Sequence, residues 1–89
     1  MILQKPAVAG SLESSDALIT IEPSSALEVQ IESVVMRQFG DAIDRAVREV
    51  LAEQDVTSGC IRVQDRGALE CTIKARVEAA LGRAGEVGK

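Results

Sequence analysis

The chain has 89 residues, of which 46% are hydrophobic and 27% charged, a balance that predicts one small folded domain and argues against disorder. It contains no histidine, which excludes Ser-His-Asp and Cys-His catalytic sites and His-ligated metal sites within this chain. The formal net charge is −4 and Phe39 is the sole aromatic residue, so neither phosphate-backbone binding nor base stacking, and hence no nucleic-acid partner, is expected.

The first 33 residues are predicted to form three strands. A weak strand candidate spans residues 6–12 and ends near Gly10, residues 17–22 are rich in aliphatic and β-branched side chains, and residues 27–32 alternate between apolar and polar. Residues 13–16 (ESSD) indicate an exposed turn between the first two strands. Short connections among the three strands predict an antiparallel meander.

A helical period replaces the strand period over residues 34–54, with Ser33 as the expected N-cap. We expect Phe39 to be buried between this helix and the sheet, where its truncation to alanine would cost about 3–5 kcal/mol. The predicted apolar stripe consists of Val35, Phe39, Ile43, Ala46, Val47 and Val50.

The last third is predicted to hold a strand and a second helix. Residues 57–59 end the first helix, residues 60–65 form a fourth strand with Ile61 and Val63 inward, and residues 68–83 return to helical spacing. Residues 86–89 are expected to fray. The apolar face of the second helix is predicted to comprise Leu69, Ile73, Val77, Ala80 and Leu81.

This order, β-β-β-α-β-α, predicts a two-layer α+β sandwich with both helices on one face of a mixed sheet. The third strand, first helix and fourth strand fit a right-handed crossover, which makes those two strands parallel. We expect a single domain over residues 1–89, with strands in residues 1–33 and a helix-strand-helix unit in residues 34–89.

The cysteines, Cys60 and Cys71, fit neither a disulfide framework nor a CxxC metal or redox motif. Apolar neighbours of both predict structural, at least partly shielded thiols. The sequence shows no signal-peptide pattern and no apolar run near the roughly 20 residues of a membrane span. We therefore expect a cytoplasmic protein with no metal and no membrane association.

Little in the sequence marks a catalytic site. No carboxylates are paired as an acid/base couple by the pattern alone, and no phosphate-binding loop of the GxxxxGK[ST] type occurs. The net negative charge lies entirely in residues 1–33, which hold five acidic residues and one basic residue, Lys5. An exposed serine in the acidic turn at residues 13–16 could be a modification site for another enzyme or simply part of a turn.

Three segments resemble motifs of one family, that of the citrate lyase acyl carrier protein, or gamma chain. Residues 6–16 (PAVAGSLESSD) resemble its N-terminal motif, and residues 38–43 (QFGDAI) its first-helix motif. Residues 65–71 (DRGALEC), followed by residues 75–79 (ARVEA), are similar to its C-terminal motif. Together the matches cover the chain nearly end to end and in order.

The resemblance implies a carrier without catalytic residues. It implies a 2'-(5''-phosphoribosyl)-3'-dephospho-coenzyme A group joined by a phosphodiester to Ser14, with Ser15 and then Ser11 as less favoured positions. A common form of the family motif has glycine where this chain has Ser15. The thiol of the group would carry acetyl and citryl while citrate is cleaved to acetate and oxaloacetate. The implied partners are the alpha (acyl transferase) and beta (citryl lyase) chains and a prosthetic-group transferase.

Other carriers and one other class of protein remain open. The carrier of malonate decarboxylase has a similar serine motif and a strand ending in Glu-Pro, as at Glu22-Pro23, whereas residues 65–71 favour citrate lyase. A citramalate lyase carrier would look much the same. The alternative from another class of protein is an unmodified adaptor that only holds subunits together.

Overall fold

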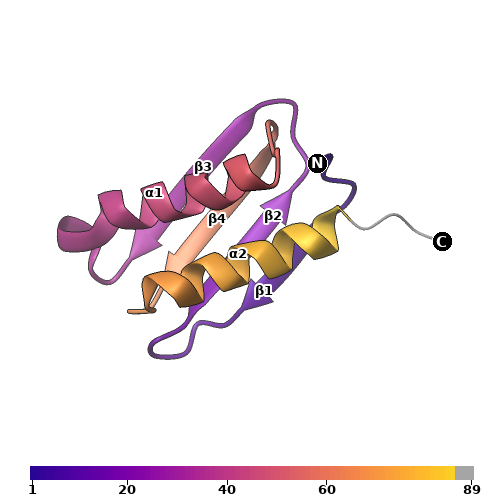
Figure 1. Ribbon diagram of the computed structural model, residues 1–89. Coiled ribbons are helices and arrows are strands. Elements are labelled where there is room, and N and C mark those ends of the chain that lie inside the picture. Colours follow the sequence, from indigo (N-terminus) through magenta and orange to yellow (C-terminus); the bar gives the residue numbers. More distant parts are fainter. Residues whose placement is uncertain (86–89) are drawn as a thin grey trace.

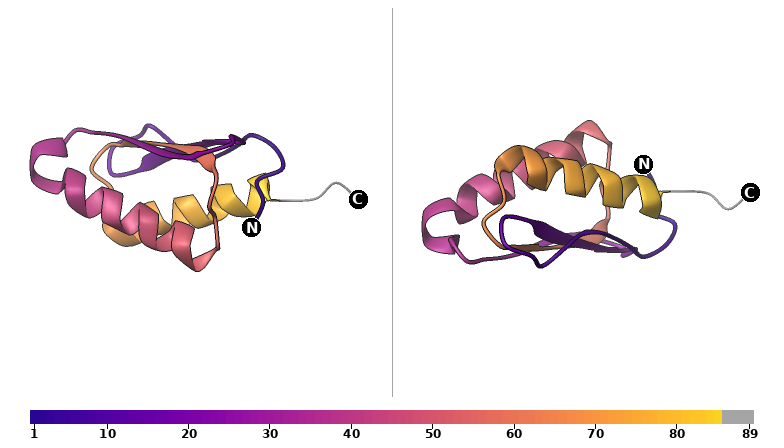
Figure 2. Two further views of the ribbon diagram at one scale, coloured as in Figure 1. Left: turned by 90° about the horizontal axis from the view of Figure 1, so that it is seen from above. Right: turned by 90° about the horizontal axis from the view of Figure 1, so that it is seen from below.

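A computed structural model describes residues 1–85, and the fraying predicted for residues 86–89 lies outside that range. It shows the predicted α+β fold, with two helices over one face of a four-stranded mixed sheet (Figures 1 and 2). Neither helix in the described range has the length and apolarity needed to cross a membrane. The elements are β1 (Ala7–Gly10), β2 (Ala17–Glu22), β3 (Leu27–Ser33), α1 (Met36–Glu53), β4 (Gly59–Asp65) and α2 (Glu70–Ala84).

The strand order is β1-β2-β4-β3, so the predicted three-stranded meander is wrong. β1 and β2 pair antiparallel as expected, but β4 lies between β2 and β3, antiparallel to the first and parallel to the second. The parallel pairing of β3 and β4 confirms the predicted crossover through α1. Ile61 and Val63 of β4 are fully buried, whereas Val29 and Ile31 of β3 are only partly buried. The fully buried inner face of β4 suits the centre of the sheet, and the half-buried inner face of β3 suits its edge.

The core lies between the sheet and the helices. Alternate residues of β2 and β4 face the helices, and the register places Ile19 opposite Val63 and Ile21 opposite Ile61. α2 packs on β1 and β2, and α1 packs on β3 and on α2. Burying each of these large aliphatic side chains stabilises the fold by about 1.5–3 kcal/mol.

The prediction that Phe39 is buried is wrong. The predicted stripe on α1 is buried from Ile43 to Val50, but the Phe39 side chain is 53% exposed. Its helical turn lies at the end of the molecule, where neither α2 nor the sheet covers it (Figure 2). Leu69 is 71% exposed for a related reason, because α2 begins only at Glu70 and Leu69 itself has extended backbone angles.

Candidate functional site

The turn between β1 and β2 carries the serines selected from the sequence. Ser14 and Ser15 are both exposed, as predicted for this segment. The Asp16 backbone N–H donates to the Glu13 carbonyl oxygen at 3.1 Å and closes the turn. Two further backbone hydrogen bonds, from Ser15 N–H to the Arg66 carbonyl (2.8 Å) and from Arg66 N–H to the Asp16 carbonyl (2.9 Å), join the turn to the end of β4.

The Asp16 carboxylate holds the turn in place from the other side. It accepts hydrogen bonds from the Ser11 hydroxyl (2.7 Å), the Ala17 backbone N–H (2.7 Å) and the Arg76 Nε–H of α2 (3.0 Å). The Ser11 hydrogen bond first, then the bonds from Arg76 and Ala17, lower the pKa of Asp16 from 3.8 to about 2. Asp16 is therefore ionised at neutral pH and connects the turn to α2.

The three candidate serines differ in their surroundings. The Ser11 hydroxyl is engaged, since it donates to Asp16 and accepts from the Glu13 N–H at 3.2 Å. Ser15 has a left-handed backbone with φ of +66°, a conformation in which glycine is favoured. The Ser14 hydroxyl is exposed and makes no hydrogen bond to any residue in the range 1–85.

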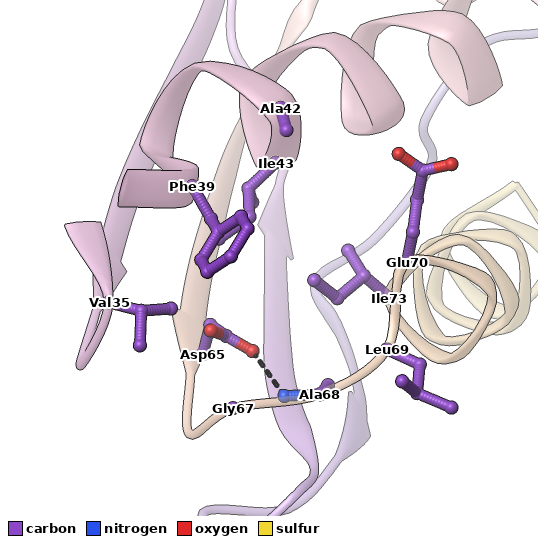
Figure 3. Close-up of a pocket in the computed structure, with 10 residues that line it drawn as sticks. All are labelled: Val35, Phe39, Ala42, Ile43, Asp65, Gly67, Ala68, Leu69, Glu70 and Ile73. Atoms are coloured by element: carbon purple, nitrogen blue, oxygen red, sulfur yellow. Dashed lines mark hydrogen bonds between the residues drawn. The ribbon is translucent and has the colours of Figure 1, made fainter. Parts of the chain in front are cut away.

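Asp65, at the end of β4, was not singled out from the sequence. It is 1% exposed and is the one buried charged side chain among the described residues. Its carboxylate accepts hydrogen bonds from the Ser33 hydroxyl (2.7 Å) and from the Ala68 backbone N–H (2.9 Å, Figure 3). Its carbonyl oxygen accepts from the Val34 N–H at 3.3 Å. Asp65 thereby joins the connection between β3 and α1 to the loop between β4 and α2.

These contacts also explain why the prediction of Ser33 as an N-cap is wrong. α1 begins at Met36, and its N-cap residue is Val35, which provides no side-chain hydrogen bond. The Ser33 hydroxyl donates to Asp65 and accepts from the Val35 N–H at 3.1 Å. It therefore fixes the segment that precedes the helix.

An apolar groove of about 610 Å³ opens between the first turns of α1 and α2. In Figure 3 the Phe39 ring of α1 and the Ile73 side chain of α2 point toward one another across it. This groove was not predicted from the sequence, because its wall residues Phe39 and Leu69 were assigned to the core. The groove is lined by Val35, Phe39, Ala42, Ile43, Asp65, Gly67, Ala68, Leu69, Glu70 and Ile73.

The cysteines lie apart from the serine turn. Cys60 is half-buried on the helix-free face of the sheet, where the register places Glu22 and Glu28 on either side of it. Cys71 is exposed in the first turn of α2, so the expected shielding of this thiol is wrong. Neither cysteine forms a disulfide, and residues 1–85 contain no group of three or more side chains that could hold a metal ion.

Comparison with known proteins identifies the family. A family model for acyl carriers described as "Malonate decarboxylase delta subunit (MdcD)" matches residues 4–84. The citrate lyase acyl carrier protein of Treponema denticola is 48% identical over 97% of this chain and 99% of its own length. Citrate lyase acyl carrier protein 2 of Salmonella typhimurium is 50% identical over 97% of this chain and 91% of its own length. This chain belongs to the citrate lyase acyl carrier protein family.

Membership makes the chain a carrier and not a catalyst, in agreement with the resemblance noted in its motifs. The fold of the carrier is shared with a chain in the crystal structure of a Pseudomonas malonate decarboxylase hetero-tetramer in complex with malonate. The TM-score is 0.78 at 20% identity, with 96% of this chain and 93% of that chain covered. At this identity the similarity concerns the fold alone.

Proposed function

We propose that the carrier is a subunit of a citrate lyase complex and bears a phosphoribosyl-dephospho-coenzyme A group on Ser14. The names of relatives 43–50% identical to it support the complex. The observation that supports the site is the exposed Ser14 hydroxyl, which is free of hydrogen bonds within residues 1–85, on a turn held at both sides. When bound, the group supplies the thiol that carries acetyl and citryl during cleavage of citrate to acetate and oxaloacetate.

The residues of the carrier present the attachment point and provide no chemistry of their own. Asp16 and the Ser15–Arg66 backbone bond hold the turn, so Ser14 projects from a fixed position. The transferase that attaches the group must supply the base for the Ser14 hydroxyl, since no titratable side chain of residues 1–85 hydrogen-bonds to it. Tethering then raises the effective concentration of the thiol at the alpha and beta chains. We place this complex in the cytoplasm.

Mass spectrometry tests the attachment. The carrier is produced together with the prosthetic-group transferase, its intact mass is measured, and the adduct is located by peptide mapping. We expect one adduct on the parent and on the Ser11→Ala and Ser15→Ala variants, and none on Ser14→Ala. The Ser15→Gly variant, which suits the left-handed backbone, should also be modified.

Two results would contradict the proposal in different ways. An adduct on Ser14→Ala would move the site to another serine and leave the carrier role intact. An unmodified carrier in an active native complex would instead support the adaptor alternative.

A second candidate is the carrier subunit of a malonate decarboxylase. The description of the matching family model and the shared fold favour it, whereas the higher identity to citrate lyase carriers favours the first proposal. Reconstitution with catalytic chains separates the two. A citrate lyase carrier, once acetylated, should exchange its acyl group when citrate is the substrate, whereas a malonate decarboxylase carrier should do so when malonate is the substrate. A citramalate lyase complex is distinguished in the same assay by its substrate.

A further inference from the structure

The apolar groove adjoins the attachment turn. Ser15 donates its backbone N–H to the carbonyl of Arg66, and the next residues, Gly67 to Leu69, form one wall of the groove. The serine turn and the first turns of both helices lie at the same end of the molecule (Figure 1). The chain termini of the described range lie at the other end, where the Gln4 N–H donates to the Ala84 carbonyl.

The lining of the groove suits a ligand that is apolar with a few polar groups. Its volume of about 610 Å³ lies within the range of roughly 300–1,000 Å³ that is typical of small-molecule sites. Phe39 and Leu69 leave 53% and 71% of their surface exposed, which is unusual for large apolar side chains that border one cavity. The backbone N–H groups of Glu70 and Cys71 in the first turn of α2 have no partner within residues 1–85, so donors are available beside the apolar walls.

We propose that this groove is the resting site of the acyl-bearing end of the carrier's own arm. The inference rests on the proposed attachment at Ser14. The pantetheine part of such an arm combines a dimethyl group and methylene segments with two amides and a thioester. The apolar parts would contact Phe39, Ile73 and Leu69, and an amide or thioester carbonyl would accept from the free N–H groups of α2.

The arm is long enough to reach. Its pantetheine part has about as many chain atoms as four residues, which span roughly 14 Å when extended. The attachment turn is separated from the groove only by the strand end at Arg66 and Gly67, and the molecule measures 22 × 18 Å across its two shorter axes. Because the arm is covalently held near the groove, weak contacts suffice to fill it.

Nuclear magnetic resonance of the modified, acetylated carrier tests the site without any partner chain. Phe39 is the sole aromatic residue of the chain, so its ring protons are the only aromatic side-chain signals of the protein and need be distinguished only from those of the adenine in the arm. We expect nuclear Overhauser effects between these ring protons and the dimethyl group of the arm. A modified carrier that shows none would overturn the inference while leaving the proposed function intact. A carrier on which no adduct forms would overturn both.

A kinetic measurement gives an independent result. Acetyl loss to hydroxylamine is followed by intact mass and compared with acetyl-coenzyme A under the same conditions. If the arm occupies the groove about nine-tenths of the time, the acetyl group is lost roughly tenfold more slowly than from acetyl-coenzyme A. Phe39→Ala should reduce this protection to less than about threefold, whereas Ile2→Ala, a 76% exposed residue at the other end, should retain it.

The alternative occupant is a partner protein. If the parent carrier loses acetyl as fast as acetyl-coenzyme A does, and Phe39→Ala weakens only the exchange with the alpha chain, the groove is a protein interface. That outcome would overturn the proposal.

Discussion

Replacement of Asp65 by alanine tests whether one buried carboxylate holds together the end of the molecule that carries the candidate site. The carboxylate is 1% exposed and accepts two hydrogen bonds, from the Ser33 hydroxyl and the Ala68 backbone N–H. The variant removes both acceptors and leaves two donors facing the space that the carboxylate filled. Ser33 precedes α1 and Ala68 precedes α2, so both helix starts should loosen.

The expected loss of stability follows from these two contacts. Hydrogen bonds to a charged partner stabilise by about 1.5–3 kcal/mol each, and a buried donor left unpaired has a penalty of about 1–3 kcal/mol. Since the two contacts share one carboxylate and water can enter after truncation, we expect a loss of about 3–5 kcal/mol for Asp65→Ala. A domain of this length has a total stability of roughly 5–13 kcal/mol. Asp65→Asn keeps the shape and one acceptor oxygen and should lose less.

Urea unfolding followed by far-ultraviolet circular dichroism measures these differences, because the chain has no tryptophan or tyrosine for fluorescence. Asp44→Ala is the matched control, since the Asp44 side chain is 41% exposed and pairs with Arg48 on the surface of α1 at 3.0 Å. It should lose about 0.5 kcal/mol or less. If Asp65→Ala lost no more than Asp44→Ala, the carboxylate would not be holding the two connections. A double-mutant cycle with Ser33→Ala should give a coupling of at least about 1 kcal/mol.

Three further predictions concern the groove, the turn and the thiols. Phe39→Ala should lose less than about 1 kcal/mol of stability. Ile43 lies on the same helix but is only 5% exposed, so Ile43→Ala should lose about 2–5 kcal/mol. Equal losses would contradict the exposure of Phe39. The pKa of Asp16 is lowered, so the contribution of its carboxylate to stability is complete above the ordinary pKa of 3.8 and is lost as the pH falls toward about 2. In urea titrations, the difference in stability between the parent and Asp16→Asn should therefore shrink over that pH interval. A difference independent of pH would refute this. A Cys60→Ala, Cys71→Ala double variant, isolated with its prosthetic group, should still take up acetyl by intact mass, whereas failure to do so would give a protein thiol a part in the chemistry.

Periodicity and residue composition together were sufficient to predict the helices and strands found in residues 1–85, but not the order of the strands. The alternation in β3 and β4 and the stripe on α1 each report which residues face a core, and this is a local property of the chain. The position of β4 between β2 and β3 depends on pairing between segments far apart in the chain, since residues 17–22 pair with residues 60–65. Val29 and Ile31 alternate as clearly as Ile61 and Val63 do, so the pattern alone could not tell edge from centre.

The helix ends were the weakest part of the sequence-based prediction, and they form the groove. Phe39 and Leu69 continue an apolar stripe beyond the length of helix that another element covers. Periodicity records which side of a helix is apolar and contains nothing about how far the neighbouring layer extends. Apolar residues at such positions are therefore assigned to the core, although here they line a surface cavity.

Burial of Asp65 was equally inaccessible to sequence reasoning, because its partners are distant. The pattern Asp65-Arg66-Gly67 is typical of an exposed turn. The Ser33 hydroxyl that makes burial tolerable lies 32 residues earlier in the chain, next to Asp65 only because β3 and β4 pair in parallel with Ser33 opposite Asp65. The serine turn, by contrast, was correctly predicted as an exposed turn, since its signal is local.

The loop after β4 couples the attachment turn to the groove. Arg66 makes two backbone hydrogen bonds to the turn, while its neighbours Asp65 and Gly67 line the groove. A displacement of this loop must therefore move Ser14 and the groove wall together. The Asp65→Asn variant is the perturbation that should show this, since it weakens the loop without opening a cavity. Hydrogen exchange at the Ser15 N–H should then accelerate together with exchange at the Ala68 N–H, because one loop position fixes both donors. Acceleration at Ala68 alone would show that the turn is held by Asp16 and Arg76 without help from the loop.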